Sequence, residues 1–213
     1  MKANPPKRLL LRHGPSGCQS PARAGRALQG FTLLELTVVL AIVAVVTTLA
    51  IPSFMRLVQS STMSNNVNTF MADLRFARSE SMRRGGGVVM CRSDAPEAVS
   101  PICNTTSGPS GQGWVSGWIV YLDANKDGVI DAGDLLRMQS PIARMDSIIE
   151  NGGNASSIFR FTATGRLSNA SSATSLQFGG SAYASDVQRV LCVNPGGRAR
   201  IAGNGGASCG ADS

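Results

Sequence analysis

The chain has few of the side chains that perform acid–base or nucleophilic catalysis. Its 213 residues include a single histidine, His13, and Lys126 is the only lysine after residue 30. No Gly-Lys-Ser/Thr motif is present, which excludes the common phosphate-binding loop. Serine is abundant, but the sequence offers no evident base to activate it. The sequence therefore predicts a protein that is not an enzyme.

Acidic residues are missing from the first 30 positions. Six of the 20 lysine and arginine residues lie there, namely Lys2, Lys7, Arg8, Arg12, Arg23 and Arg26. The rest of the chain carries the remaining 14 cations and all 13 acids, a net charge of about +1. The pI near 9.7 therefore reflects this basic segment and predicts no large basic surface elsewhere.

A long apolar run follows the basic segment. Residues 31–51 contain one charged residue, Glu35. As a helix, this run would reach about 30 Å, which is enough to cross the hydrocarbon core of a bilayer. Basic flanks stay on the cytoplasmic side, so the rest of the chain would lie across the membrane. A charge within a bilayer costs roughly 2.5–3.5 kcal/mol or more, and we therefore expect Glu35 to have a partner.

The stretch Gly30-Phe31-Thr-Leu-Leu-Glu35-Leu resembles the processing site and N-terminal helix of type IV pilins and of type II secretion pseudopilins. In those proteins a prepilin peptidase cleaves after the glycine and methylates the new N-terminus, which implies cleavage between Gly30 and Phe31. The resemblance also implies that Glu35 pairs with the N-terminal amine of a neighbouring subunit. Pro52 matches a proline that kinks the helix in this family and does not have to end it.

The same resemblance implies three segments with different environments. Residues 1–30 would be a cleaved leader, and residues 31–52 the transmembrane and assembly half of a helix. Residues 53–213 would form an amphipathic half-helix and a β-rich globular domain in the periplasm. The protein would be a single-pass protein of the inner membrane that joins other pilins or pseudopilins in a filament.

Apolar residues recur at helical spacing beyond Pro52, and charged residues lie mostly elsewhere on the helical wheel. The apolar positions are Val67, Phe70, Met71, Leu74 and Ala77. The charged positions are Arg75, Arg78, Glu80 and Arg83. This pattern predicts a helix that lays its apolar stripe on a globular domain and ends at Gly85-Gly86-Gly87.

The pattern after Gly87 is typical of strands. Strands are predicted at residues 88–91, 113–122, 135–139, 157–162, 175–178 and 189–193. Loops rich in glycine and serine are predicted at residues 104–113, 151–156 and 168–175. A long helix followed only by strands predicts an α+β fold, pilin-like, with the helix packed on an antiparallel β-sheet domain.

Three consecutive segments resemble the GspH/FimT branch of the pilin superfamily. They are the run from Phe70 to Arg84, the Val-Val-Met-Cys strand after it, and the Gly-Trp-Ile-Val-Tyr-Leu-Asp segment that ends at Asp123. Members of this branch are minor pilins or minor pseudopilins that help to start and cap a filament. The resemblance implies a role in assembly of a type IV pilus or a type II secretion pseudopilus. The alternative is a subunit at the pilus tip that binds DNA for uptake in natural transformation.

Four cysteines follow the expected cleavage site, and the periplasm is an oxidising compartment. Of three possible pairings, Cys91–Cys103 with Cys192–Cys209 is the simplest because both bridges are local. Four buried free thiols are the alternative. The spacing contains no Cys-x-x-Cys pair, which argues against a zinc site.

Residues 123–134 match the template of a calcium-binding loop. The expected ligands are Asp123, Asn125, Asp127, the carbonyl of Val129, Asp131 and Asp134. Two features argue against calcium: the last position is an aspartate, shorter than the usual glutamate, and the flanks predict strands instead of helices. The alternative is a hairpin turn in which Asp, Asn and Gly serve the backbone geometry. No other cofactor is expected.

The segment Gly197-Arg198-Ala199-Arg200 lies between Cys192 and Cys209. It is similar to the Gly-Arg-x-Arg motif that contacts DNA in FimT-type minor pilins, which implies that Gly197, Arg198 and Arg200 bind double-stranded DNA. Arginines on alternate residues of an extended segment point the same way, and arginine matches phosphate bidentately. Glycines would also let backbone amides approach the phosphate. The alternative is that both arginines are merely solvated.

Three further arginines could extend this surface if the fold brings them close to it. They are Arg160, Arg166 and Arg189. The sequence does not place them.

Overall fold

The structure is a computed structural model of the chain, and it describes residues 30–106, 108–151 and 157–210. The expected leader, apart from Gly30, lies outside the described residues. The chain divides into two compact units, Met1–Val45 and Val46–Ser213.

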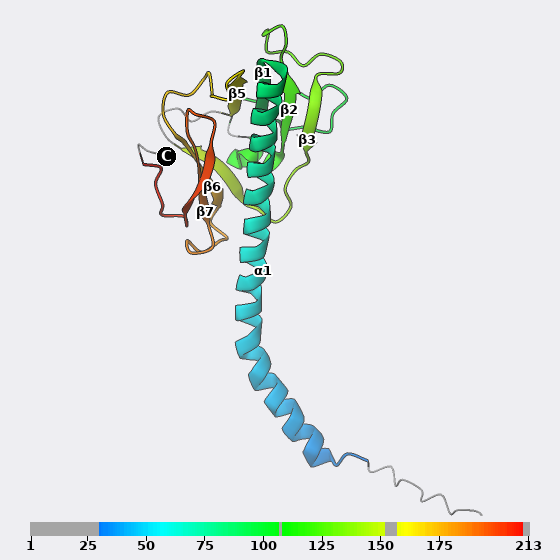
Figure 1. Cartoon of the computed structure of the whole chain (residues 1–213). Helices are drawn as coiled ribbons and strands as arrows, with labels where there is room; N and C mark the ends of the chain where they lie inside the picture. Colours follow the sequence, from blue (N-terminus) through cyan, green and yellow to red (C-terminus); the bar gives the residue numbers. More distant parts are fainter. Residues whose placement is uncertain (1–29, 107, 152–156, 211–213) are drawn as a thin grey trace, which may run out of the picture. The chain divides into compact units, whose positions relative to one another are not determined.

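A single helix of 52 residues, α1 (Leu33–Arg84), begins just after the expected cleavage site and continues through Pro52 (Figure 1). Thr32 caps its start, because the Thr32 hydroxyl accepts a hydrogen bond from the amide of Glu35 (3.1 Å). The helix ends at Arg84, where Gly85 takes a positive φ of 81° that favours glycine after a helix. The predicted helix and its end are confirmed.

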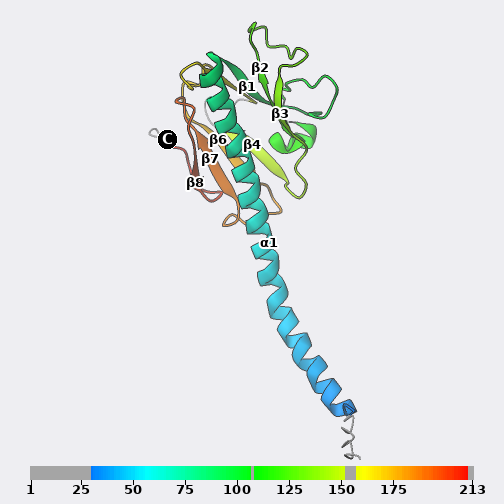
Figure 2. The same ribbon diagram turned by 45° about the vertical axis from the view of Figure 1, so that its right-hand side comes forward.

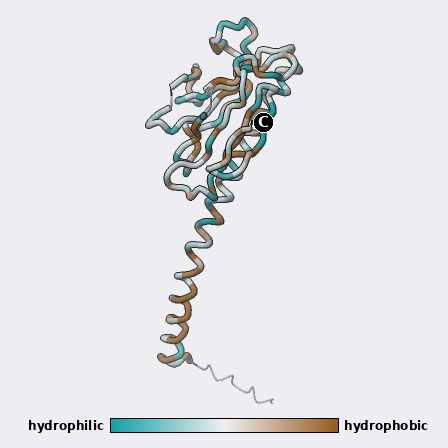
Figure 3. The backbone as a smooth tube through the Cα atoms, turned by 90° about the vertical axis from the view of Figure 1, so that its left-hand side faces the viewer, coloured by the Kyte–Doolittle hydropathy of each residue, from teal (hydrophilic) through white to brown (hydrophobic). Residues whose placement is uncertain are grey.

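The part of α1 in the first unit is largely apolar, apart from Glu35, and its side chains are exposed. Its large side chains include Leu33, Leu36, Val39, Leu40, Ile42 and Val43. Figure 3 shows mostly hydrophobic colour along this part of the helix. By length and composition, α1 is the one helix in the described residues that could cross a membrane. Exposed apolar surface of this extent is disfavoured in water and indicates a lipid or protein environment.

In the described part of the second unit, eight strands follow α1 and form two four-stranded antiparallel sheets (Figures 1 and 2). The first sheet has the order β3-β2-β1-β5, with bounds β1 (Gly86–Arg92), β2 (Trp118–Leu122), β3 (Leu135–Gln139) and β5 (Ile158–Thr162). The second has the order β4-β6-β7-β8, with bounds β4 (Ser147–Asn151), β6 (Thr174–Gly179), β7 (Arg189–Val193) and β8 (Ala199–Gly203).

The predicted α+β class is confirmed. The structure differs from the sequence prediction in the number of sheets, which is two instead of one, and in the details of three strands. The strand predicted over residues 113–122 begins only at Trp118, because Trp114–Ser116 form a 3₁₀ turn. Strand β4 was not predicted, because only Ile148 and Ile149 are apolar in it. Strand β8 was not predicted either, because it lies among glycines and asparagines. It carries Arg200, so part of the expected arginine loop is a strand.

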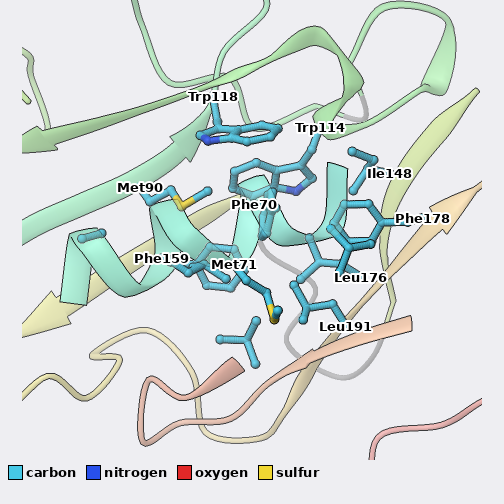
Figure 4. Close-up of a cluster of buried hydrophobic side chains, with 14 of the residues drawn as sticks. Phe70, Met71, Met90, Trp114, Trp118, Ile148, Phe159, Leu176, Phe178 and Leu191 are labelled. Atoms are coloured by element: carbon cyan, nitrogen blue, oxygen red, sulfur yellow. The ribbon is translucent and has the colours of Figure 1, made fainter. Parts of the chain in front are cut away.

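The C-terminal half of α1 and the two sheets enclose one hydrophobic core. The predicted stripe of α1 is buried throughout, from Val67 to Ala77. Phe70 lies at its centre, with its ring 5.1 Å from Trp114, 4.9 Å from Trp118 and 5.6 Å from Phe178 (Figure 4). Trp118 belongs to the first sheet and Phe178 to the second, so one helical side chain contacts both.

Two polar side chains of α1 are also buried against the sheets. Asp73 accepts hydrogen bonds from the indole of Trp118 (2.8 Å) and from the guanidinium of Arg137 (2.7 Å). Arg137 in turn lies over the ring of Phe76, 4.1 Å from its centroid. The hydroxyl of Ser81 contacts the carbonyls at the end of β5. These bonds fix where the helix lies along the first sheet.

We expect Asp73→Ala to destabilise the second unit. The change leaves the buried indole N–H of Trp118 without an acceptor, which costs about 1–3 kcal/mol. Chemical denaturation of the processed chain in detergent, followed by tryptophan fluorescence, measures the loss. Glu80→Gln on the same helix is the control, because Glu80 forms only exposed ion pairs that contribute little. Equal effects of the two changes would contradict the role of Asp73.

Candidate functional site

The expected processing segment lies directly before α1 and is accessible. Gly30 has no atom within 4 Å of the position where a Cβ would be, and the side chain of Phe31 is 82% exposed. Glu35 lies in the first turn of the helix and makes no ion pair with any residue that the structure describes. A carboxylate on an apolar helix surface therefore remains available for a partner outside this chain.

The acidic loop at residues 123–134 is organised by its own side chains. Asn125 donates to Asp127 (2.8 Å), Asp127 accepts from the amide of Val129 (2.8 Å), and Asp134 accepts from the amide of Asp131 (3.1 Å). These bonds are those of a turn.

The first expected calcium ligand, Asp123, faces a different partner. Its Oδ2 accepts a hydrogen bond from Arg160 (2.9 Å) and its Oδ1 is buried without a partner among the described residues. In the described ranges no group of three or more His, Cys, Asp or Glu side chains is placed to hold a metal ion. The calcium site stays a prediction without structural support, and we propose none.

Both expected disulfides are formed. Cys91–Cys103 joins β1 to the loop after it, with a Cα–Cα distance of 5.5 Å. Cys192–Cys209 joins β7 to the C-terminal segment across 5.7 Å. The second bridge closes a loop of the chain that includes the Gly-Arg-x-Arg segment, so β8 is held between its own hydrogen bonds to β7 and a covalent link.

The Gly-Arg-x-Arg segment begins in the tight turn that joins β7 to β8. Asn194 and Arg198 continue the antiparallel pairing beyond the strands, through the Asn194 amide and the Arg198 carbonyl (3.0 Å). Arg198 and Arg200 are two residues apart on this extended stretch, and both are exposed. They therefore lie on one face, opposite the face on which Val193 and Ala199 meet the core.

Two backbone amides of this turn, those of Gly197 and Arg198, are not available to a phosphate. The amide of Gly197 donates to the carbonyl of Asn194 (2.8 Å), and the amide of Arg198 donates to the Asn194 side chain (3.0 Å). Gly197 is itself buried. The exposed parts of this motif are the side chains of Arg198 and Arg200.

The further arginines considered from the sequence differ in their partners. Arg160 pairs with Asp123, and Arg189 donates from one nitrogen to the carbonyls of Asp186, Val187 and Gln188. Arg166 is exposed and has no ion pair within the described residues. Sequence reasoning missed Arg78 as a neighbour of this region, because a helical-wheel position does not show which loop packs against it.

Known proteins were compared with the chain by sequence and by structure. A family model described as type II transport protein GspH matches residues 66–197, and one described as the prokaryotic N-terminal methylation motif matches residues 26–51. No curated protein matches the chain.

Two solved structures, both of the type IV minor pilin FimU of Pseudomonas aeruginosa, are similar to 68% of this chain. One is 17% identical, is covered over 93% of its length and has a TM-score of 0.49. The other is 16% identical, is covered over 98% and has a TM-score of 0.46.

We expect Gly197→Ala to destabilise the turn before β8. Gly197 has a φ of 73°, and a Cβ there would stand 2.1 Å from the carbonyl oxygen of Gly165, so the two turns would have to separate. Strain of this kind costs of order 1–3 kcal/mol. Gly196→Ala is the matched control, because its Cβ would meet only the Asn194 side chain at 3.2 Å. Thermal unfolding should show a clearly lower Tm for Gly197→Ala; equal Tm values would contradict the tight contact.

Proposed function

We propose that this chain, which belongs to the GspH family of type II transport proteins, is a minor pilin or pseudopilin that is cleaved after Gly30 and assembled through α1. The observation that carries the proposal is the match to the methylation motif over residues 26–51 at the start of a helix of 52 residues. The N-terminal part of that helix is exposed and apolar, and its C-terminal part belongs to the core of a globular unit.

The proposed assembly uses Glu35 as its polar contact. After cleavage the N-terminal ammonium of Phe31 lies four residues before Glu35, at the start of the same apolar helix. The ammonium is therefore not shielded from lipid by its own chain. A neighbouring subunit with the same segment offers the opposite charge. An unpaired charge in a low-dielectric environment is strongly disfavoured, so the pair between subunits fixes their axial register.

The proposed location is the inner membrane, with the globular unit in the periplasm before incorporation into a pilus or pseudopilus. Two disulfides in the second unit support an oxidising compartment. The basic residues before Gly30 support a cytoplasmic N-terminus. The proposed partners are other pilins or pseudopilins and the prepilin peptidase.

We expect Glu35→Ala to be inserted and processed but to enter filaments poorly. In a host that lacks its own copy, intact mass should show a mature chain that starts at N-methylated Phe31, for the wild type and the variant alike. Immunoblots of sheared filaments or of pseudopili should contain much less of the variant. Glu35→Gln removes the charge but keeps the shape of the side chain, and it should enter filaments as poorly as Glu35→Ala does.

The control for this experiment is Thr37→Ala, two residues further along the same helix, which should assemble normally. Normal incorporation of Glu35→Ala would exclude the pairing role and leave the processing intact. An uncleaved chain in a host with active prepilin peptidase would overturn the proposed function as a whole.

A second candidate function, DNA binding at the filament tip, is favoured by one observation. Arg198 and Arg200 are exposed on one face of the β7–β8 hairpin, and Cys192–Cys209 fixes the hairpin to the C-terminal segment. Guanidiniums held in this way can contact phosphates of a duplex without reading its sequence.

We expect the double change Arg198→Gln and Arg200→Gln to remove most binding of double-stranded DNA. The measurement is a mobility shift with the processed chain in detergent, at low and at moderate salt. Losing two phosphate contacts should reduce the salt slope by about two, and the Tm should not change. Should the wild-type chain give no shift at low salt, this second candidate falls and the assembly function is untouched.

A further inference from the structure

Two turns from distant parts of the sequence touch through glycines. The turn after β5 spans Thr162 to Arg166, closed by hydrogen bonds from the amides of Thr162 and Gly165. The carbonyl of Gly165 in this turn lies against Gly197, because a Cβ on Gly197 would stand only 2.1 Å from the Gly165 carbonyl oxygen. The amide of Leu167 also donates to the carbonyl of Pro195 (2.9 Å). The turn that carries Arg166 is therefore fixed beside the turn that carries Arg198.

Helix α1 brings a third arginine to the same point. A Cβ on Gly165 would stand 2.9 Å from Nε and 3.1 Å from Cγ of Arg78, so the stem of Arg78 lies across this glycine. Figure 2 shows the end of α1 beside the turn after β5. The Nε of Arg78 is buried and has no hydrogen-bond partner among the described residues. A buried donor of this kind is normally paired. Because this nitrogen lies under the Gly165 turn, a ligand outside the chain would reach only the terminal guanidinium nitrogens of the half-buried Arg78 side chain.

The charges of these three arginines are not balanced within the chain. Arg78, Arg166 and Arg198 make no ion pair with any residue in the described ranges. On the same helix, Arg83 and Arg84 differ from Arg78 because both pair with Glu80. Hydrogen bonds from these two arginines lower the pKa of the Glu80 carboxyl to about 2, so it stays ionised at neutral pH.

We propose that Arg78, Arg166 and Arg198 form one phosphate-binding surface, the three-arginine surface, that takes the phosphodiester backbone of double-stranded DNA. This inference rests on the second candidate function and adds two contacts, from α1 and from the turn after β5, to the Gly-Arg-x-Arg segment. Arg166 and Arg198 are exposed, so the surface fits a polyanion that runs past it better than a small anion that must be enclosed.

The chemistry of the side chains favours phosphate. Each guanidinium offers a planar fork of donors that matches two phosphate oxygens. Arginines on three segments held together by backbone contacts lose little freedom on binding, whereas arginines on separate mobile loops would each have to be ordered. Because no described base-reading element accompanies them, we expect binding that is indifferent to sequence.

The test compares single variants of the processed chain in detergent, by fluorescence anisotropy with a labelled DNA duplex over a range of salt. The variants are Arg78→Gln, Arg166→Gln and Arg198→Gln. Each should weaken binding and reduce the slope of log Kobs against log salt by about one. Arg78→Lys keeps the charge, so it should keep the wild-type slope. The control is Arg83→Gln, which removes an already paired arginine five residues along the same helix and should leave affinity and slope unchanged.

The outcomes separate this inference from the function on which it rests. If Arg198→Gln weakens binding while Arg78→Gln and Arg166→Gln bind as the wild type does, the three-arginine surface is wrong and the second candidate stands. If Arg83→Gln weakens binding as much as Arg78→Gln, general charge explains the effect and the inference is overturned. Tm values within about 1 °C of each other show that a loss of binding is not unfolding. If Arg78→Gln unfolds, the salt slope of Arg166→Gln decides, and an unchanged Arg166→Gln slope sinks the proposal.

Discussion

The packing of Phe70 between two sheets is the contact on which the globular unit depends. Its ring meets Trp118 of the first sheet, Phe178 of the second, and Trp114 of the turn between β1 and β2, all in edge-to-face geometry. Aromatic pairs in this geometry contribute beyond their buried area. The stripe of α1 completes the core, so we expect the globular unit to be strongly destabilised without the C-terminal half of the helix. Assembly through the N-terminal half and folding through the C-terminal half thus share one element.

Sequence periodicity predicted the elements whose residues interact with their near neighbours. The stripe from Val67 to Ala77, the end of α1 at Gly85 and the strands β3 and β7 follow from local patterns, and so do the two local disulfides. Strands β4 and β8 were missed because pairing with β6 and β7 stabilises them despite weak local preference. The division into two sheets was also not predictable, because it depends on which strands pair across long stretches of sequence.

The polar contacts of the site are the part that no local pattern could give. Asp73 and Arg137 are 64 residues apart in sequence, and Gly165 and Gly197 meet only because β5 and the β7–β8 turn lie at the same end of the unit. Arg92 is fully buried and bonds to Asp94, Thr106 and Ser116. Nothing in its sequence surroundings distinguishes it from a solvated surface arginine. The Gly-Arg-x-Arg segment was found as a motif, but only its surroundings show that its amides are already bonded.

Seven arginines of the globular unit differ in whether the chain provides them with an acceptor. Arg92, Arg137, Arg160 and Arg189 have acceptors within the chain and serve the fold. Arg78, Arg166 and Arg198 have none in the described residues, although they come from three different elements and meet around one glycine contact. Like charges repel one another more strongly the closer they lie, so a fold gains by placing an acid among neighbouring cations. The phosphate backbone proposed as the ligand of the three-arginine surface would supply that negative charge from a partner.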